Sequence, residues 1–144
     1  MKQWCVVDAG GQCYGVSVDR VIEVVRGTTV ERVPGAPSGV RGLVNLRGQL
    51  VVALDVATLV DDGGRDTERG GVAVAVVVSH QGESIALCVD RVQDVRDVEE
   101  SETVPPPSGS GGLEKVSHAV AIDGEQIIAE LDIERLVTRV GVQR

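Results

Sequence analysis

Two histidines and three cysteines are the residues of this chain that could most readily support catalysis or metal binding. His80, Cys88 and His118 could in principle meet at one zinc site, which needs three or four ligands at suitable spacing. They lie far apart in sequence, however, and both histidines fall near predicted loops or strand ends. We therefore interpret the histidines as exposed polar positions, and we expect neither a metal nor a cofactor.

The sequence contains none of the short motifs that mark common enzymes. It has no Gly-x-Ser-x-Gly nucleophile turn, no Walker loop for phosphate and no His-Glu-x-x-His zinc motif. Paired carboxylates could serve as general acid and base. The densest acidic group lies in or beside a predicted loop, as expected for a solvated surface: Asp94, Asp97, Glu99, Glu100 and Glu102. The chain therefore has the features of a protein that binds rather than one that reacts.

Composition restricts the partners and the compartment. The net charge of −8 disfavours nucleic acid and anionic lipid as partners. The sequence has no run of about 18 apolar residues that could span a membrane, and its N-terminus lacks the pattern of a signal peptide. The cysteines are odd in number and have no Cys-x-x-Cys spacing, which is typical of core thiols in a reducing compartment. We expect a cytoplasmic protein.

The apolar residues favour strands over helices. Valine is the most abundant residue, whereas the chain has one tryptophan, one tyrosine and no phenylalanine. The branched Cβ of valine fits a pleated, half-buried surface. A core of this composition suits two small β-barrels better than a helical bundle.

Two pairs of similar segments indicate an internal duplication. GQCYGVSVDRVIEV (11–24) resembles GESIALCVDRVQDV (82–95) without a gap. LVNLRGQLVVALDVATLV (43–60) resembles AVAIDGEQIIAELDIERLV (119–137), with one extra residue after the turn glycine. An ordered pair of repeats predicts a β unit that occurs twice, with a cleft between two lobes.

The duplicated unit predicts an all-β fold with two sets of five strands. Strands are expected at 3–7, 12–18, 40–46, 49–54, 72–78, 84–89, 91–98, 116–122 and 125–131, and residues 19–25 read as a strand or a short helical turn. Asp55 and Asp132 each suit the N-cap of a short helix, over 56–60 and 133–138. Asp123-Gly124 is a strong type I′ turn signal.

Loops and linkers separate these elements. Residues 31–39 form a proline- and glycine-rich loop, residues 61–71 a polar linker and residues 101–112 a flexible or extended connector. We expect a single domain over 1–144. Its approximate lobes are 12–70 and 72–138, and the N-terminal strand could belong to the second lobe.

The stretch from residue 21 to 60 resembles the CheW-like domain of bacterial chemotaxis adaptor proteins. VIEVV (21–25), VPGAP (33–37) and VRGLVNLRGQLVVALDV (40–56) follow the family's xxEVx, VPxAP and GxxNLRGxxxPVxDL patterns. IALCVDRVQDV (85–95) is similar to the family's GLxVDxVxxV, so the likeness covers nearly the whole chain. The family often has proline where this chain has Val52, and Trp4 could stand in for a usual aromatic residue.

This resemblance implies two five-stranded, SH3-like barrels that share a hydrophobic interface. It also implies that the protein couples the cytoplasmic tips of chemoreceptors to the histidine kinase CheA, whose regulatory domain has the same fold and joins the adaptor barrel to barrel. Such a protein would lie at membrane-associated receptor arrays without inserting into the bilayer.

The resemblance also selects candidate docking residues. Arg47, beside Gly48 at a hairpin tip, can direct its planar guanidinium toward a carboxylate, and Glu23 is the partner that the resemblance suggests. The pair could be an internal salt bridge, a direct partner contact, or both, while Asn45 could bond to turn backbone groups or to a partner. Apolar residues that could line the same surface or belong to the core are Val21, Val25, Val33, Leu43 and Val44.

Two alternatives stay open on the sequence alone. The same fold could serve a chemosensory pathway other than flagellar chemotaxis, for example one for pilus motility. A small-molecule-binding β protein or minor hydrolase would need a closed apolar pocket with convergent polar groups. The scarcity of aromatic residues and histidines argues against the second alternative.

Overall fold

A computed structural model describes residues 1–61 and 70–141 of the chain. The strands at the start are β1 (Lys2–Ala9), β2 (Gln12–Ser17), β3 (Val21–Val30), β4 (Val40–Leu46) and β5 (Gln49–Asp55). Those that follow are β6 (Gly71–His80), β7 (Glu83–Val89), β8 (Arg91–Val98), β9 (Val120–Asp123) and β10 (Gln126–Glu130). The helical segments are η1 (Val18–Arg20), α1 (Val56–Val60), η2 (Glu100–Glu102), α2 (Gly112–Val116) and α3 (Ile133–Thr138).

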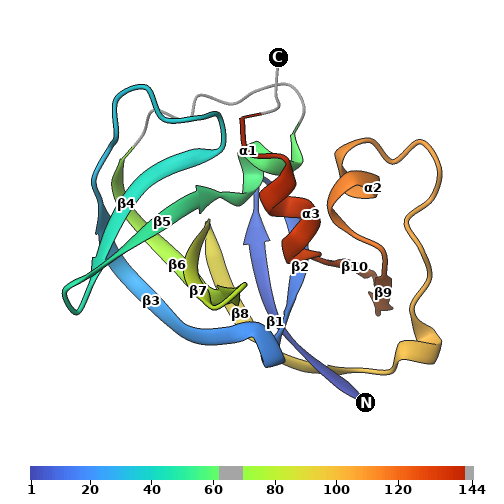
Figure 1. The fold of residues 1–144 in the computed structure, drawn as a ribbon. Coiled ribbons are helices and arrows are strands. Elements are labelled where there is room, and N and C mark those ends of the chain that lie inside the picture. Colours follow the sequence, from blue (N-terminus) through green and yellow to red (C-terminus); the bar gives the residue numbers. More distant parts are fainter. Residues whose placement is uncertain (62–69, 142–144) are drawn as a thin grey trace.

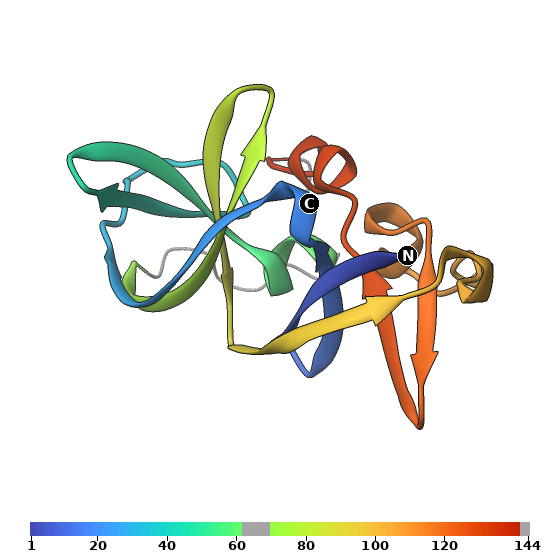
Figure 2. The same cartoon turned by 90° about the horizontal axis from the view of Figure 1, so that it is seen from below.

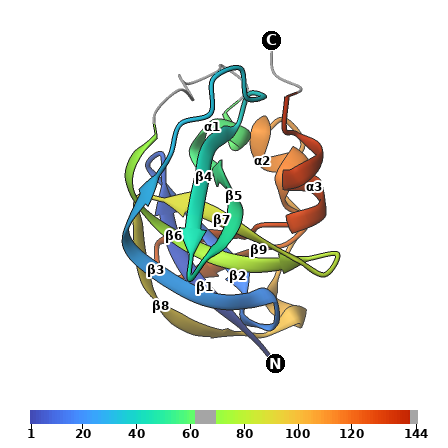
Figure 3. The same ribbon diagram turned by 60° about the vertical axis from the view of Figure 1, so that its left-hand side comes forward.

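The strands form two curled five-stranded sheets, which confirms the predicted all-β class (Figure 1). The first sheet has the order β3-β6-β7-β5-β4, and the second has the order β8-β1-β2-β10-β9. The three α-helices gather on one side of the molecule, next to the junction of the sheets (Figures 1 and 3). None of the helices in the described residues is long and apolar enough to cross a bilayer.

The two halves of the chain exchange their opening hairpins. Hairpin β1–β2 lies between β8 and β10 of the second half, and hairpin β6–β7 lies between β3 and β5 of the first half. Each hairpin is joined to its host by one parallel pair, β2 with β10 and β7 with β5. The sheets therefore do not follow the predicted lobes 12–70 and 72–138, because β2 belongs to the second sheet and β6 and β7 belong to the first.

The duplicated Val-Asp-Arg motif stands where the chain passes from one sheet to the other. Arg20 Nε donates to the carbonyl oxygen of Ser79 over 2.9 Å, and Arg91 Nε donates to Asp8 Oδ2 over the same distance. Each arginine thus binds the hairpin that the other half contributes. The Asp90 carboxylate also accepts a hydrogen bond from the backbone N–H of Gly10, at 2.8 Å. The motif holds the exchanged hairpins in place, a role that the repeat alone did not suggest.

Three apolar clusters account for the packing. The central cluster combines both sheets with α1 and α3, through residues such as Val7, Leu87, Leu59 and Leu136. A second cluster fills the inside of the first sheet and consists mainly of valine and alanine. A third fills the inside of the second sheet around Trp4.

Strands that are buried on both faces link these clusters. Along β6, Ala73, Ala75 and Val77 point into the first sheet, whereas Val76 and Val78 face the central cluster. This confirms that both faces of the apolar run 72–78 are largely covered. In β1 the same alternation places Trp4 inside the second sheet, where its ring lies against Gly15.

Both predicted helix caps are present. The Asp55 carboxylate accepts a bond from the backbone N–H of Thr58 at 3.3 Å, and Asp132 accepts one from Arg135 N at 3.1 Å. Asp55 and Arg41 are both buried, and Asp55 Oδ1 lies 3.9 Å from Arg41 Nη1. Arg41, in β4, also donates to the carbonyl oxygens of Gly70 and Val72, so it ties the start of β6 to β4.

Two local predictions differ from the structure, and a third lies mostly outside the described residues. The connector predicted over 101–112 contains η2, and α2 occupies residues 112–116, so the next strand begins at Val120 rather than at 116. The turn of the last hairpin is Gly124-Glu125 instead of Asp123-Gly124, because Asp123 pairs with Gln126. Most of the predicted linker 61–71 lies outside the described residues.

Candidate functional site

The β4–β5 hairpin ends in a tight turn at Arg47-Gly48. Leu46 pairs with Gln49, and both turn residues have positive φ angles, 51° at Arg47 and 85° at Gly48. Two consecutive positive φ values are the signature of a type I′ turn. Asn45 Oδ1 accepts the backbone N–H of Gly48 at 2.8 Å, so the predicted bond from Asn45 to the turn is present.

Arg47 and Glu23 form an ion pair that joins the hairpin tip to β3. Arg47 Nη1 donates to Glu23 Oε1 over 3.1 Å, and Nη2 makes a second, shorter bond to Oε2. Such a two-bond pairing fixes the guanidinium plane as well as its distance. The Arg47 side chain remains 75% exposed and that of Glu23 26% exposed. We call this contact the first tip pair.

The first tip pair should be visible in the titration of Glu23. Its bonds to Arg47 lower the pKa of the Glu23 carboxyl below its ordinary value. A lowered folded-state pKa means that the pair contributes at and above the ordinary glutamate pKa and is lost as the pH falls through the folded-state value. We expect carboxyl NMR to report a lowered Glu23 pKa that moves up in an Arg47→Gln variant. An unchanged Glu23 pKa in that variant would contradict the pairing in solution.

The outer face of the same hairpin is apolar. Leu43 lies opposite Val52 and Asn45 lies opposite Leu50, so these four side chains share one face of the ladder. Leu50 is 72% exposed and Val52 is 42% exposed. Leu43, Asn45, Leu50 and Val52, together with the first tip pair, form what we call the hairpin face. Exposed apolar side chains with a polar border make this face a candidate for protein contact.

The other predicted residues lie in different environments. Val33 is exposed in the loop before β4, whereas Val21 and Val25 are half-buried and pack on the central cluster and the first-sheet cluster. Val44 is only 1% exposed and belongs to the inside of the first sheet. Val44 is therefore a core residue and not a docking residue, because a partner cannot reach it without opening the sheet.

The second sheet has a similar contact with the opposite arrangement of charge. Arg96 of β8 donates from Nη1 to Asp123 Oδ2 over 2.9 Å, at the end of β9. The arginine is on the long strand and the carboxylate is on the hairpin, the reverse of Arg47 and Glu23. We call this the second tip pair. In both sheets, then, an ion pair ties a hairpin end to a long strand.

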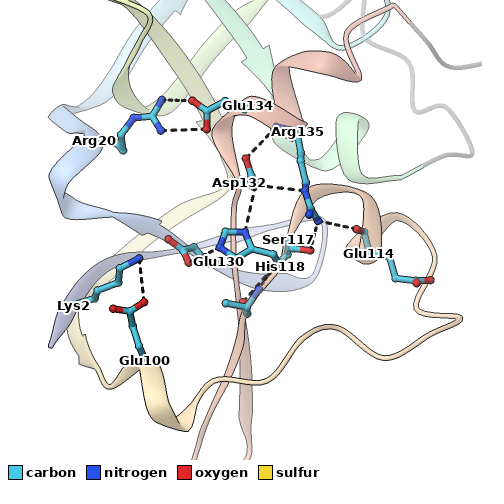
Figure 4. A network of polar contacts seen from close by, with 11 residues as sticks. Lys2, Arg20, Glu100, Glu114, Ser117, His118, Glu130, Asp132, Glu134 and Arg135 are labelled. Carbon is cyan, nitrogen blue, oxygen red and sulfur yellow. Dashed lines mark hydrogen bonds and ion pairs between the residues drawn. The ribbon is translucent and has the colours of Figure 1, made fainter.

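A polar network connects α3 with neighbouring segments, and Figure 4 shows it at close range. Arg20 binds Glu134 with two bonds, at 3.0 and 3.4 Å, and lowers the pKa of that carboxyl. His118 Nδ1 lies 3.3 Å from Asp132 Oδ2, next to Ser117 in the chain. These residues do not make a Ser-His-Asp catalytic set, because the buried Ser117 hydroxyl donates to the carbonyl of Ala119.

The described residues also place the suggested zinc ligands in separate environments. Cys88 is buried inside the first sheet, His80 lies 3.4 Å from Glu134, and His118 lies beside Asp132. Within residues 1–61 and 70–141, no group of three or more His, Cys, Asp or Glu side chains is arranged to hold a metal ion.

Comparison with known proteins gives consistent matches over most of the chain. The family model described as "CheW-like domain" matches residues 3–141. "Chemotaxis protein CheW" of Treponema pallidum is 26% identical, covering 94% of this chain and 81% of that protein. The protein of the same name from Rhizobium meliloti is 32% identical, covering 85% of this chain and 80% of its own length.

Two further matches concern a differently named relative and a solved structure. "Protein FrzA" of Myxococcus xanthus is 27% identical, covering 78% of this chain and 69% of that protein. The crystal structure of the scaffolding protein TtCheW from Thermoanaerobacter tengcongensis superposes with a TM-score of 0.76 at 23% identity. That superposition covers 90% of this chain and 88% of the other, and it supports the fold described above.

Proposed function

Because this chain belongs to the CheW-like domain family, we propose that it is a non-enzymatic adaptor that couples chemoreceptors to the histidine kinase CheA. The family match covers residues 3–141, so it includes both sheets and the hairpin face.

The hairpin face is the structural feature that best supports the proposal. Its tip is fixed by the turn bond from Asn45 and by the first tip pair, while Leu50 and Val52 stay exposed beside it. A fixed, partly apolar surface loses little conformational freedom on binding, which favours docking of another folded domain. The partners proposed are the regulatory domain of CheA, which would pack barrel to barrel, and the cytoplasmic tip of a chemoreceptor.

Adaptor contacts need only modest strength. An interface on the order of 1,000 Å² gives a weak or transient single contact. Many such contacts in an array multiply their effect through high local concentration. Linkage of about 1–3 kcal/mol between the receptor and kinase contacts suffices to shift the kinase equilibrium. The proposed location is cytoplasmic, at membrane-associated receptor arrays.

A second candidate keeps the same mechanism in another pathway. One relative has the name FrzA rather than CheW, so the family match does not distinguish flagellar chemotaxis from other chemosensory outputs such as pilus motility. In that case a different CheA-type kinase and a different receptor would occupy the same surfaces.

A pull-down from an extract of the native cell tests the proposal. Tagged protein is expected to recover a CheA-type kinase and a chemoreceptor together. The identity of the recovered kinase assigns the pathway. A Leu50→Glu variant, which places a charge on the hairpin face, should recover less of both proteins, whereas Ile127→Glu serves as an exposed apolar control on the other sheet. Recovery of neither a kinase nor a receptor by the wild-type protein would contradict the proposal.

A further inference from the structure

The edge strands of the second sheet, β8 and β9, face each other across a gap that no hydrogen-bonded ladder closes. At one end of the gap Val104 exchanges backbone hydrogen bonds with Val120, at 2.9 and 2.7 Å. At the other end stands the second tip pair, Arg96 with Asp123. In Figure 2, β8 runs in gold toward η2 beside the orange hairpin of β9 and β10.

A pocket of about 190 Å³ opens in this gap. Val98 and Ile128, which belong to the apolar cluster inside the second sheet, line it together with Ala121. The volume is several times the roughly 30 Å³ that one water molecule occupies in the liquid. The pocket therefore has room for a side chain and an apolar surface against which a chain of methylene groups could pack.

The rim of the pocket is acidic. Asp97, Glu99, Glu102 and Asp123 line it, and Arg96 is the one cationic residue of the lining. The Arg96 guanidinium is already bound to Asp94 and Asp123, at 3.0 and 2.9 Å. Its charge is thus compensated inside the protein, and the remaining carboxylates leave the rim with negative charge.

Glu99 and Glu102 carry this uncompensated charge. Both are exposed, Glu99 just before the turn η2 and Glu102 at its end, and no lysine or arginine of the described ranges pairs with either of them. Lys2 approaches the neighbouring Glu100 instead, at 3.9 Å, and Glu100 does not line the pocket. Asp97 accepts a bond from the neutral Gln3 amide at 3.0 Å.

We propose that this pocket binds a lysine or arginine side chain of a partner protein. The aliphatic stem of such a residue would pack on Val98, Ala121 and Ile128, and its charged head would remain at the wet rim beside Glu99 and Glu102. Charge complementarity selects a basic side chain over a neutral or acidic one. The site lies on the sheet that does not carry the hairpin face, so it is a second contact that goes beyond the proposed function.

The test is an NMR titration of the full-length protein with single-residue probes. N-acetyl-lysine amide and N-acetyl-arginine amide are compared with N-acetyl-norleucine amide, which has the stem without the charge. At low salt, the basic probes should give saturable shifts of the amides of Val98, Glu99 and Ala121. Norleucine should bind on the order of tenfold more weakly, since it makes no ion contact with Glu99 or Glu102.

Variants connect the shifts to the acidic rim. A Glu99→Gln/Glu102→Gln protein should bind the lysine probe about tenfold more weakly, in line with screened ion pairs at a protein surface. An Asp19→Asn/Glu83→Gln protein has the same net charge as the rim variant but loses two exposed carboxylates far from the pocket in sequence. It should bind the lysine probe as the wild type does. Equal binding of norleucine and lysine, undiminished binding to the rim variant, or no saturable shift at the pocket would each overturn the inference. Because no kinase or receptor is used, these outcomes are independent of the adaptor proposal.

Discussion

Replacement of Arg47 by glutamate is expected to weaken the binding of this protein to kinase and receptor on the order of tenfold. Such a loss is within the usual range of coupling energies. The substitution places a second carboxylate beside Glu23 at the tip of the β4–β5 hairpin, where the first tip pair now stands. Repulsion would move the tip away from β3 and displace the adjacent Leu50 and Val52. The measurement is co-sedimentation of the variant with receptor-containing membranes and CheA. Thermal unfolding, followed by the buried Trp4, should remain close to that of the wild type.

A charge exchange separates the two roles that the pair could have. If its role is to position the hairpin, the Glu23→Arg/Arg47→Glu double variant should recover most of the binding, because the ion pair is restored in reverse. The reversed charges of the second tip pair show that either orientation fits a hairpin end. Lys2→Glu, at a partly exposed lysine 3.9 Å from Glu100 on the other sheet, is the matched control and should bind nearly normally. A double variant that binds as poorly as Arg47→Glu would show that Arg47 itself touches a partner.

Replacement of Gly42 by alanine is expected to lower the free energy of unfolding by about 3 kcal/mol or more, the cost of combined backbone strain and a steric clash. Gly42 in β4 has a φ of 153°, and an added Cβ would stand 2.1 Å from the carbonyl oxygen of Glu31. That oxygen accepts the backbone N–H of Leu43 at 2.8 Å, in the bridge that brings the loop after β3 against β4. The substitution therefore acts directly on the support of the hairpin face.

Urea unfolding with Trp4 fluorescence measures this effect. Gly82→Ala is the control, because Gly82 also has a positive φ, 80°, but its Cβ would meet no atom within 4 Å. It should lose only about 1 kcal/mol, the cost of a left-handed conformation for a residue with a side chain. A Gly42→Ala protein no less stable than Gly82→Ala would contradict the close approach of these segments.

Local signals in the sequence predicted most of the secondary structure. Asp55 and Asp132 precede short apolar segments, and each caps a helix as expected. Arg47-Gly48 forms the predicted turn. The helix α2 was missed because Gly111 and Gly112 suggest flexibility. In the fold, Gly112 instead permits close packing, since a Cβ there would lie 1.7 Å from the carbonyl oxygen of Val60.

The pairing of sheets and the exposed face could not be predicted in the same way. The repeat shows which strands correspond, but it contains no information on which sheet hosts each opening hairpin. Residues 50–54 are apolar without alternation, so the sequence does not reveal that Leu50 and Val52 face outward while Val51 faces inward. Glu23 was linked to Arg47 through the family resemblance, because the residues alone do not bring β3 to the hairpin tip.

The proposed adaptor role means that this chain joins a kinase to a receptor through docking surfaces and carries out no reaction itself. It is tested most directly by mixing receptor-containing membranes, CheA and ATP, and measuring kinase phosphorylation with and without the purified protein. We predict that receptor control of CheA appears only when the protein is added, and that it rises with protein concentration to saturation. Full receptor control without the protein, or kinase activity that does not change on its addition while both partners are active, would rule out the adaptor role.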